Sequence, residues 1–181
     1  MHRKVIEVPE GIEVTVEGLK VRVKGKLGEL ERNFENAHTR KTIRIEKEGN
    51  KIIVSTDRKN RKYKAIAFAI TAHIRNMFKG VQEGFEYRLK VIYTHFPINV
   101  QIQGGEMVIQ NFMGEKAVRK VKLDPNVEVK IQGSEIIVKG LDKEMVGQLA
   151  AKIEQSCRVK GRDRRRFQDG IYMTMKAGKW L

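Results

Sequence analysis

The chain has 181 residues, and its 37 Lys and Arg outnumber its 22 Asp and Glu, which gives a formal net charge of +15 at pH 7. Like charge of this size repels itself in a compact fold, so it indicates a polyanionic partner. The single cysteine, Cys157, excludes an intramolecular disulfide and a metal site built from several cysteines. The sequence has no apolar run long enough to span a membrane and no signal peptide, so we expect a cytoplasmic protein.

Alternating apolar and polar residues predict two β-hairpins in the first half of the chain. Gly18 lies between the first two strands and Gly49-Asn50 between the next two, where tight turns favour glycine. The polar residues of these strands are mostly charged, so we expect one buried and one solvated face. The expected strands are residues 12–16, 19–23, 42–46 and 51–55.

An amphipathic helix is predicted to close the first half. From Ile66 to Phe78 an apolar residue recurs at every fourth position, which is the spacing of one helix face. We therefore expect a helix over Tyr63–Lys79 that stops at Gly80.

The second half repeats this order of elements. A longer β-type run covers Tyr87–Thr94, and two hairpins are expected across Gly104 and across Gly133-Ser134. A second amphipathic helix is expected over Lys143–Arg158, with Asp142 as its N-cap residue. The expected hairpin strands are residues 100–103, 106–109, 127–131 and 135–139.

The two halves also share residue patterns. The pattern of Val14–Glu29 recurs 86 positions later as Val100–Glu115, and that of Ile43–Val54 recurs 84 positions later as Val127–Val138. Matches in the same order indicate an internal duplication. The sequence thus predicts an α+β fold of two tandem modules, residues 1–82 and 83–181, each an antiparallel sheet packed by one amphipathic helix.

The densest charge follows the second helix, in a segment that we call the basic loop (residues 158–169). Six of its first nine positions are basic, and arginine binds phosphate with two parallel hydrogen bonds. We expect these cations to neutralise RNA phosphates, and Arg164, Arg165 and Arg166 to contact phosphates rather than each other or protein carboxylates. Aromatic side chains would pack the loop or stack on a base. The alternative is a solvated loop with its phenylalanine folded onto the core. The candidate RNA-binding residues are Arg158, Lys160, Arg162, Arg164, Arg165, Arg166, Phe167, Tyr172, Lys176 and Lys179.

A second basic cluster, which we call the N-terminal patch, precedes and enters the first helix. Basic side chains oppose the helix dipole at this end, which suggests an external anion. A solvated turn explains the cluster equally well. Its residues are Arg58, Lys59, Arg61, Lys62 and Lys64.

No catalytic constellation is predicted. The four histidines share no metal-ligand spacing, and Cys157 falls on the apolar stripe of the second helix, where core packing explains it. Asp163 and Asp169 are the only acids in the basic loop, and neighbouring arginines would lower their pKa values and make them poor bases. We therefore expect no enzyme activity, no cofactor, no metal and no small-molecule substrate.

Four stretches of the chain resemble the large-subunit ribosomal protein family numbered six in the universal scheme. The first resembles its inter-domain signature, and the other three resemble its archaeal and eukaryotic branch, whose eukaryotic members are numbered nine in the older scheme. The bacterial branch has a proline-rich loop where this chain has Arg162–Phe167. The stretches are Asn76–Phe85, Tyr93–Val100, Asn111–Lys116 and Arg166–Tyr172.

The resemblance implies two similar α+β domains and a place on the large subunit near the base of the stalk. It implies that the C-terminal domain binds ribosomal RNA close to the sarcin–ricin loop, beside neighbouring ribosomal proteins, without catalytic residues. The residues themselves leave two alternatives open, a free-standing module that binds structured RNA or DNA and a protein that modifies RNA.

Overall fold

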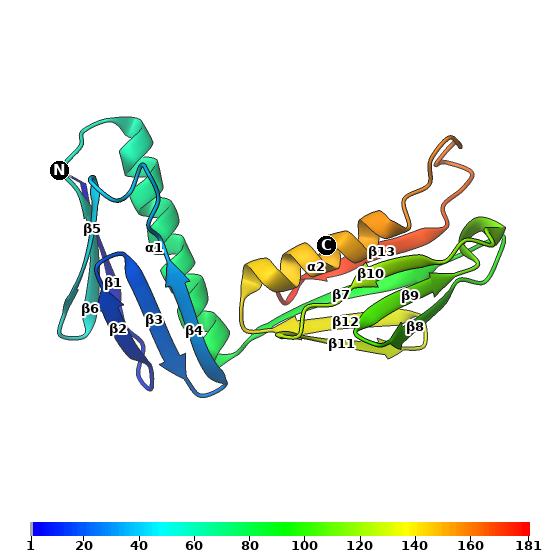
Figure 1. The fold of residues 1–181 in the computed structure, drawn as a ribbon, viewed down its shortest axis with the longest axis horizontal. Helices are drawn as coiled ribbons and strands as arrows, with labels where there is room; N and C mark the ends of the chain where they lie inside the picture. Colours follow the sequence, from blue (N-terminus) through cyan, green and yellow to red (C-terminus); the bar gives the residue numbers. More distant parts are fainter. Residues whose placement is uncertain (1) are drawn as a thin grey trace. The chain divides into compact units, whose positions relative to one another are not determined.

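The computed structural model describes residues 2–181 and divides the chain into two compact units (Figure 1). The first unit ends at Gly84 and the second spans Phe85–Leu181. The predicted boundary, between residues 82 and 83, falls at the end of the first helix.

In the described residues the first unit contains β1 (His2–Glu7), β2 (Glu13–Glu17), β3 (Lys20–Gly25), β4 (Gly28–Asn33), β5 (Ile43–Glu48), β6 (Lys51–Thr56) and α1 (Arg61–Gln82). The second unit contains β7 (Phe85–Ile92), β8 (Asn99–Gln103), β9 (Glu106–Gln110), the 3-10 helix η1 (Phe112–Gly114), β10 (Arg119–Lys122), β11 (Val127–Gln132), β12 (Glu135–Gly140), α2 (Lys143–Ser156), β13 (Gly170–Lys176) and β14 (Lys179–Trp180).

The two units share one topology, which confirms the predicted α+β duplication. The first unit has sheets of order β1-β6-β5 and β2-β3-β4, and the second has sheets of order β7-β12-β11 and β8-β9-β10 at equivalent places. All these pairings are antiparallel. The second unit differs because β13 and β14 extend its sheet beyond β7.

The four predicted hairpins are present, and their turns coincide in the two units. Gly18 and Gly104 have φ angles of 62° and 57°, and Gly49 and Gly133 have φ angles of 57° and 59°. Residues with a Cβ rarely adopt this left-handed conformation, so glycine fixes the turn and with it the strand register.

Both helices form, but their predicted ends are wrong. The first helix was expected to stop at Gly80, yet α1 continues to Gln82 with Gly80 buried inside it. The stop comes at Gly84, whose φ is 74° and whose N–H donates to Gly80 O at 3.0 Å. The second helix was expected to reach Arg158, but α2 ends at Ser156.

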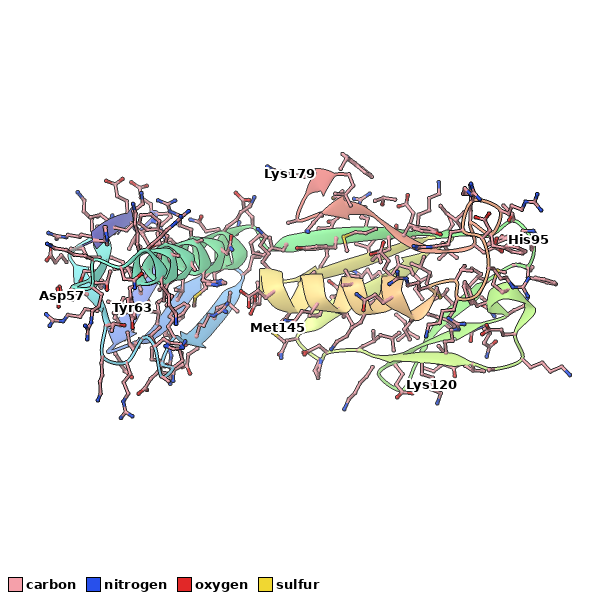
Figure 2. The ribbon with its side chains drawn as sticks, turned by 90° about the horizontal axis from the view of Figure 1, so that it is seen from above. Asp57, Tyr63, His95, Lys120, Met145 and Lys179 are labelled. Atoms are coloured by element: carbon pink, nitrogen blue, oxygen red, sulfur yellow. The ribbon has the colours of Figure 1, made fainter. Side chains whose placement is uncertain are left out.

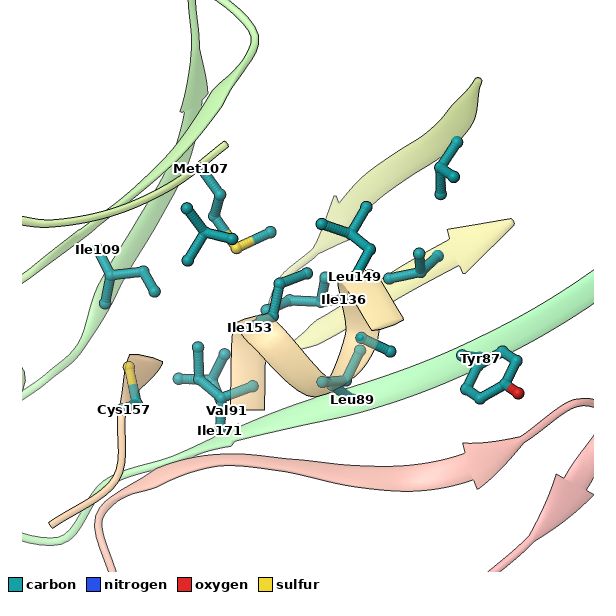
Figure 3. Close-up of a cluster of buried hydrophobic side chains, with 14 of the residues drawn as sticks. Tyr87, Leu89, Val91, Met107, Ile109, Ile136, Leu149, Ile153, Cys157 and Ile171 are labelled. Atoms are coloured by element: carbon teal, nitrogen blue, oxygen red, sulfur yellow. The ribbon is translucent and has the colours of Figure 1, made fainter. Parts of the chain in front are cut away.

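Each unit has its own apolar core. In the second unit α2 lies on the sheet, and Leu149 and Ile153 insert among residues of β7, β9 and β12 (Figure 3). Ile153 is fully buried, and so is Ile74 of α1 in the first unit. These helices therefore anchor the segments that follow them.

Candidate nucleic-acid interface

The basic loop connects the end of α2 to the start of β13, and the two ends of this connection are buried. Cys157, Val159 and Asp169 lie in the interior, whereas every arginine and lysine of the loop is exposed. Cys157 therefore packs in the core, as predicted. Because both ends are fixed, the loop holds its cations on a supported surface instead of a frayed tail.

Asp169 is the main polar anchor of the loop. Its side chain is fully buried and accepts a hydrogen bond from Thr94 Oγ1 at 2.8 Å. The backbone N–H of His95 donates to its second oxygen at 3.4 Å, and His95 Nδ1 lies 3.2 Å from Oδ1. These contacts join the loop to the segment after β7, 75 residues earlier in the chain.

Burial raises the pKa of Asp169, but hydrogen bonds from Thr94 and His95 outweigh it and leave the pKa below its ordinary value. The direction agrees with the sequence prediction, but the cause differs because no arginine contributes. A buried carboxylate held ionised by these hydrogen bonds serves as a structural acceptor and is a poor proton acceptor.

Phe167 packs the loop instead of projecting from it. Its ring is half-buried and stacks on the His95 ring, with centroids 5.1 Å apart and planes inclined by 26°. The guanidinium carbon of Arg162 lies 4.8 Å from the centroid of the same ring. The side chain thus orients Arg162 through a cation–π contact, and it contacts the edge of the core.

A tight turn shapes the tip of the loop. The N–H groups of Arg166 and Phe167 donate to Asp163 O at 3.1 and 2.9 Å. The Asp163 carboxylate also accepts from the N–H of Arg165 at 2.9 Å and from its Nη2 at 2.9 Å. The hydrogen bonds from Arg165 hold the pKa of Asp163 below its usual range.

The pairing of Arg165 corrects one expectation. We predicted that Arg164, Arg165 and Arg166 would not bind protein carboxylates, and for Arg165 this is wrong in the isolated chain. Asp163 is only two residues away, and the turn brings its carboxylate to the guanidinium. The side chains of Arg164 and Arg166 have no hydrogen-bond or ion-pair partner among residues 2–181.

A groove of ≈ 370 Å³ lies where α2 meets the loop and β13. Arg158 and Arg164 line it, together with Tyr172, Gln155 and Glu154, whose carboxylate accepts the N–H of Met173. Two exposed cations beside a half-buried aromatic ring fit a phosphate and its attached sugar or base.

Arg119 stabilises the end of α2, where the basic loop begins, a role that the sequence did not predict. Its Nη1 donates to Ser156 O at 2.6 Å, so it satisfies a carbonyl at the end of α2. Its Nη2 pairs with Glu115 at 2.8 Å, and its guanidinium lies 4.3 Å from the Phe112 ring centroid. The only part of this arrangement that the local sequence contains is the four-residue spacing of Glu115 and Arg119. That spacing does not indicate a contact between Arg119 and α2.

The structure does not bring all the predicted residues together. Lys176 and Lys179 face each other across the β13–β14 hairpin. Lys176 lies six residues along β13 from Gly170, where the loop ends, which is about 20 Å at the usual strand rise. Figure 2 shows Lys179 and His95 far apart in this unit. The loop and these lysines are therefore separate features.

The N-terminal patch lies on the β6–α1 connection and the first turn of α1. All five basic side chains are exposed, and Asn60 caps the helix by accepting from Lys62 N at 3.0 Å. The first turn contains no acidic residue. Lys64 lies over the Phe68 ring at 5.6 Å.

Within residues 2–181, no group of three or more His, Cys, Asp or Glu side chains is placed to hold a metal ion. No helix in this range is long and apolar enough to cross a membrane. The candidate site consists of exposed guanidinium and ammonium groups on an anchored backbone, and such groups can bind anions.

Fold and site together describe a duplicated α+β protein with an exposed basic surface. A sequence profile described as Ribosomal protein L6 matches residues 8–84 and 96–170 of this chain. The chain is 46% identical over 168 residues to the large ribosomal subunit protein uL6 of Aeropyrum pernix, covering 93% of this chain and 91% of that protein. It is 49% identical over 171 residues to the protein of that name from Sulfurisphaera tokodaii, with 94% and 90% covered. For Methanocella arvoryzae the identity is 43% over 173 residues, with 95% and 96% covered.

The profile matches one segment in each unit, and the relatives are similar to this chain over nearly their whole length. The chain belongs to the ribosomal protein L6 family, in its archaeal and eukaryotic branch.

Proposed function

We propose that this chain is a structural protein of the large ribosomal subunit and that the basic loop binds large-subunit ribosomal RNA. The observation that carries the proposal is the anchored loop, which presents exposed cations beside α2 while Asp169 and Phe167 fix its C-terminal end. Fixed cations bind phosphates without first losing the conformational entropy of a free chain.

Each residue has a role in this proposal. Arg158, Lys160, Arg162, Arg164 and Arg166 neutralise backbone phosphates, and Arg165 joins them when a phosphate displaces Asp163. Tyr172 lines the groove beside Arg158 and Arg164 and packs against a sugar or base. Phosphate contacts fix position and orientation without reading sequence, so the RNA is recognised by its shape.

Lys176, Lys179 and the N-terminal patch supply further contacts in the assembled particle. We place the site of action near the base of the stalk and the sarcin–ricin loop, beside neighbouring ribosomal proteins. This placement rests on what is implied by the resemblance to the family, which runs over nearly the whole chain. The protein then functions in translation, in the cytoplasmic ribosome.

Sedimentation of the tagged chain on a sucrose gradient tests the proposal. The wild-type chain should migrate with large subunits and stay there at moderate salt. A free-standing RNA-binding protein would remain near the top of the gradient and would contradict the proposal.

The loop is tested in the same gradient with Arg164→Ala/Arg166→Ala. We expect this variant to leave the subunit fraction at lower salt than wild type. Lys24→Ala/Lys26→Ala is the matched control, because it removes the same charge from exposed positions of the first unit. If the two double variants behave alike, total charge and not the loop determines binding.

A further inference from the structure

The two units differ at one sheet edge. In the second unit β7 pairs with β12 on one side and β13 on the other. In the first unit the equivalent strand, β1, pairs only with β6 among the described residues. One edge of β1 therefore presents unpaired backbone N–H and C=O groups.

Strand register relates the two edges residue by residue. Ile6 pairs with Ile52 in the first unit, and Leu89 pairs with Ile136 in the second. Because Ile52 and Ile136 are equivalent in the sequence repeat, Ile6 corresponds to Leu89. Leu89 is the residue that pairs with Met173 of β13, so the open edge beside Ile6 is where the first unit lacks a strand.

A groove occupies this position in the first unit. Its volume is ≈ 760 Å³, and it runs between β1 and α1. Ile6 and Phe78, both buried, form its apolar floor, and Arg75 and Gln82 of α1 form its wall. Val5 lies at its rim and is 43% exposed.

The helix beside the groove, α1, has a basic residue at the position where α2 of the second unit has an acidic one. In the second unit the Glu154 carboxylate accepts the N–H of Met173 at 3.0 Å and so holds β13. Alignment of the helices on Ile74 and Ile153, both fully buried, places Arg75 at the position of Glu154. Arg75 is exposed, and it has no hydrogen-bond or ion-pair partner in the described range. It can donate hydrogen bonds to an acidic side chain.

The other charged side chains along the groove are either positive, like Arg75, or paired with a side chain of opposite charge. Lys51 and Lys79 lie 3.9 and 3.7 Å from glutamates on the same rim. Lys4, further along β1, lies 5.3 Å from the Phe68 ring. The uncompensated charge is therefore positive and faces the position of the missing strand.

We propose that this groove binds an extended, acidic segment of another protein as an added antiparallel strand on β1. The strand pairs its backbone with the open edge, places a carboxylate opposite Ile6 to reach Arg75, and places apolar side chains at the neighbouring positions on the same face. A peptide strand matches the edge because its N–H and C=O groups have the same spacing, and the second unit shows that one strand fits between this helix and sheet.

Two synthetic peptides with the sequence of residues 168–177 test the proposal on the full chain. One carries Met173→Glu and the other Met173→Lys, so they differ only in the charge brought to Arg75. Hydrogen exchange of the β1 amides, followed by NMR, reports binding at the edge. We expect the acidic peptide to slow exchange in His2–Glu7 and to bind about fivefold more tightly than the basic peptide.

Substitution of Arg75 identifies the recognition group. Arg75→Glu should reverse the preference between the two peptides, and Lys41→Glu, an exposed site outside the groove, should leave it unchanged. Arg75→Ala should remove the preference without reversing it, and thermal melts confirm that each variant is folded. Equal binding of both peptides, or absence of protection in β1, would overturn the proposal.

Two further arms distinguish other occupants. A structured ribosomal RNA fragment that protects the β1 amides better than the acidic peptide would show that the groove is an RNA site. Protection that rises with protein concentration, together with a dimer in light scattering, would show that a second copy occupies it. Either result overturns the proposal.

Discussion

Replacing Asp169 with alanine should weaken RNA binding even though it removes a negative charge from a basic surface. By charge alone the substitution would strengthen binding to a polyanion. In the structure, however, the buried Asp169 carboxylate ties the basic loop to Thr94 and His95. Loss of this anchor lets the loop sample conformations in which its cations no longer match the phosphates. The apparent affinity for RNA then falls in proportion to the fraction of molecules whose loop keeps the binding conformation.

The stability cost follows from the same contacts. A hydrogen bond to a charged group contributes about 1.5–3 kcal/mol, and the shortest one here comes from Thr94 Oγ1 at 2.8 Å. Thr94 and His95 are exposed, so water can replace the lost acceptor for both donors. We therefore expect Asp169→Ala to lower the free energy of unfolding of the second unit by about 2–3 kcal/mol, and Asp169→Asn by less.

The contribution of Asp169 also depends on pH. Its folded-state pKa lies below its ordinary value, so the stabilisation is complete above about pH 5 and is lost progressively as the pH falls toward the folded-state pKa. The difference in stability between wild type and Asp169→Asn should shrink over that range. Denaturant unfolding, followed by hydrogen exchange of residues 85–181, measures it.

Asp163→Ala is the matched control, because it removes the same charge from the same loop. Asp163 pairs with Arg165 at the exposed tip, so its removal frees Arg165 and should strengthen RNA binding. If Asp169→Ala binds RNA as tightly as Asp163→Ala and unfolds like wild type, the anchoring role of Asp169 is refuted.

Three further predictions concern the two cores. Ile153→Ala should destabilise the second unit by about 4 kcal/mol, since it removes about three buried carbon groups and leaves a cavity, whereas Ile74→Ala should destabilise the first unit instead; hydrogen exchange resolved by unit distinguishes them. Gly25→Ala should lower the melting temperature of the first unit, because the new Cβ would lie 2.6 Å from Val81 Cγ2 and 3.0 Å from Val81 O; wild-type melting would show that the backbone there adjusts freely. Burial raises the pKa of the Cys157 thiol, so alkylation near pH 8 should be far slower than for a free thiol and should accelerate in denaturant; fast labelling of the native chain would contradict its burial.

Local pattern predicted the parts of the fold that have local causes. The hairpins at Gly18, Gly49, Gly104 and Gly133 follow from alternating burial and from turns that only glycine forms easily. The helices follow from apolar residues at every fourth position. The end of α1 was predicted too early because Gly80 is tolerated inside the helix, where neighbouring residues continue it.

Strands without a clear alternation of apolar and polar residues in the sequence were missed. β4 (Gly28–Asn33) alternates partly buried and exposed residues but is rich in charge, and β1 has a single fully buried residue, Ile6. β13 follows a loop with no periodicity and is fixed by pairing with β7, about 80 residues earlier. Such strands depend on a partner distant in the chain, which a local pattern does not contain.

The candidate site shows the same division. The charge of the basic loop is evident in the sequence, but its support is not. Asp169 depends on Thr94 and His95, and the end of α2 depends on Arg119. These contacts join residues that are far apart in the chain, and only the fold brings them together.

The salt dependence of binding to a structured fragment of large-subunit ribosomal RNA tests the central claim most directly. Each phosphate contact releases counterions, so log affinity should fall linearly with log salt. Arg164→Ala/Arg166→Ala should reduce the slope by about two units, and adding Arg165→Ala should reduce it by one more if a phosphate displaces Asp163. The loss should be similar for structured RNAs of different sequence, and the fold should be retained. An unchanged slope in the triple variant would contradict the account and assign RNA binding to another surface, first of all the N-terminal patch.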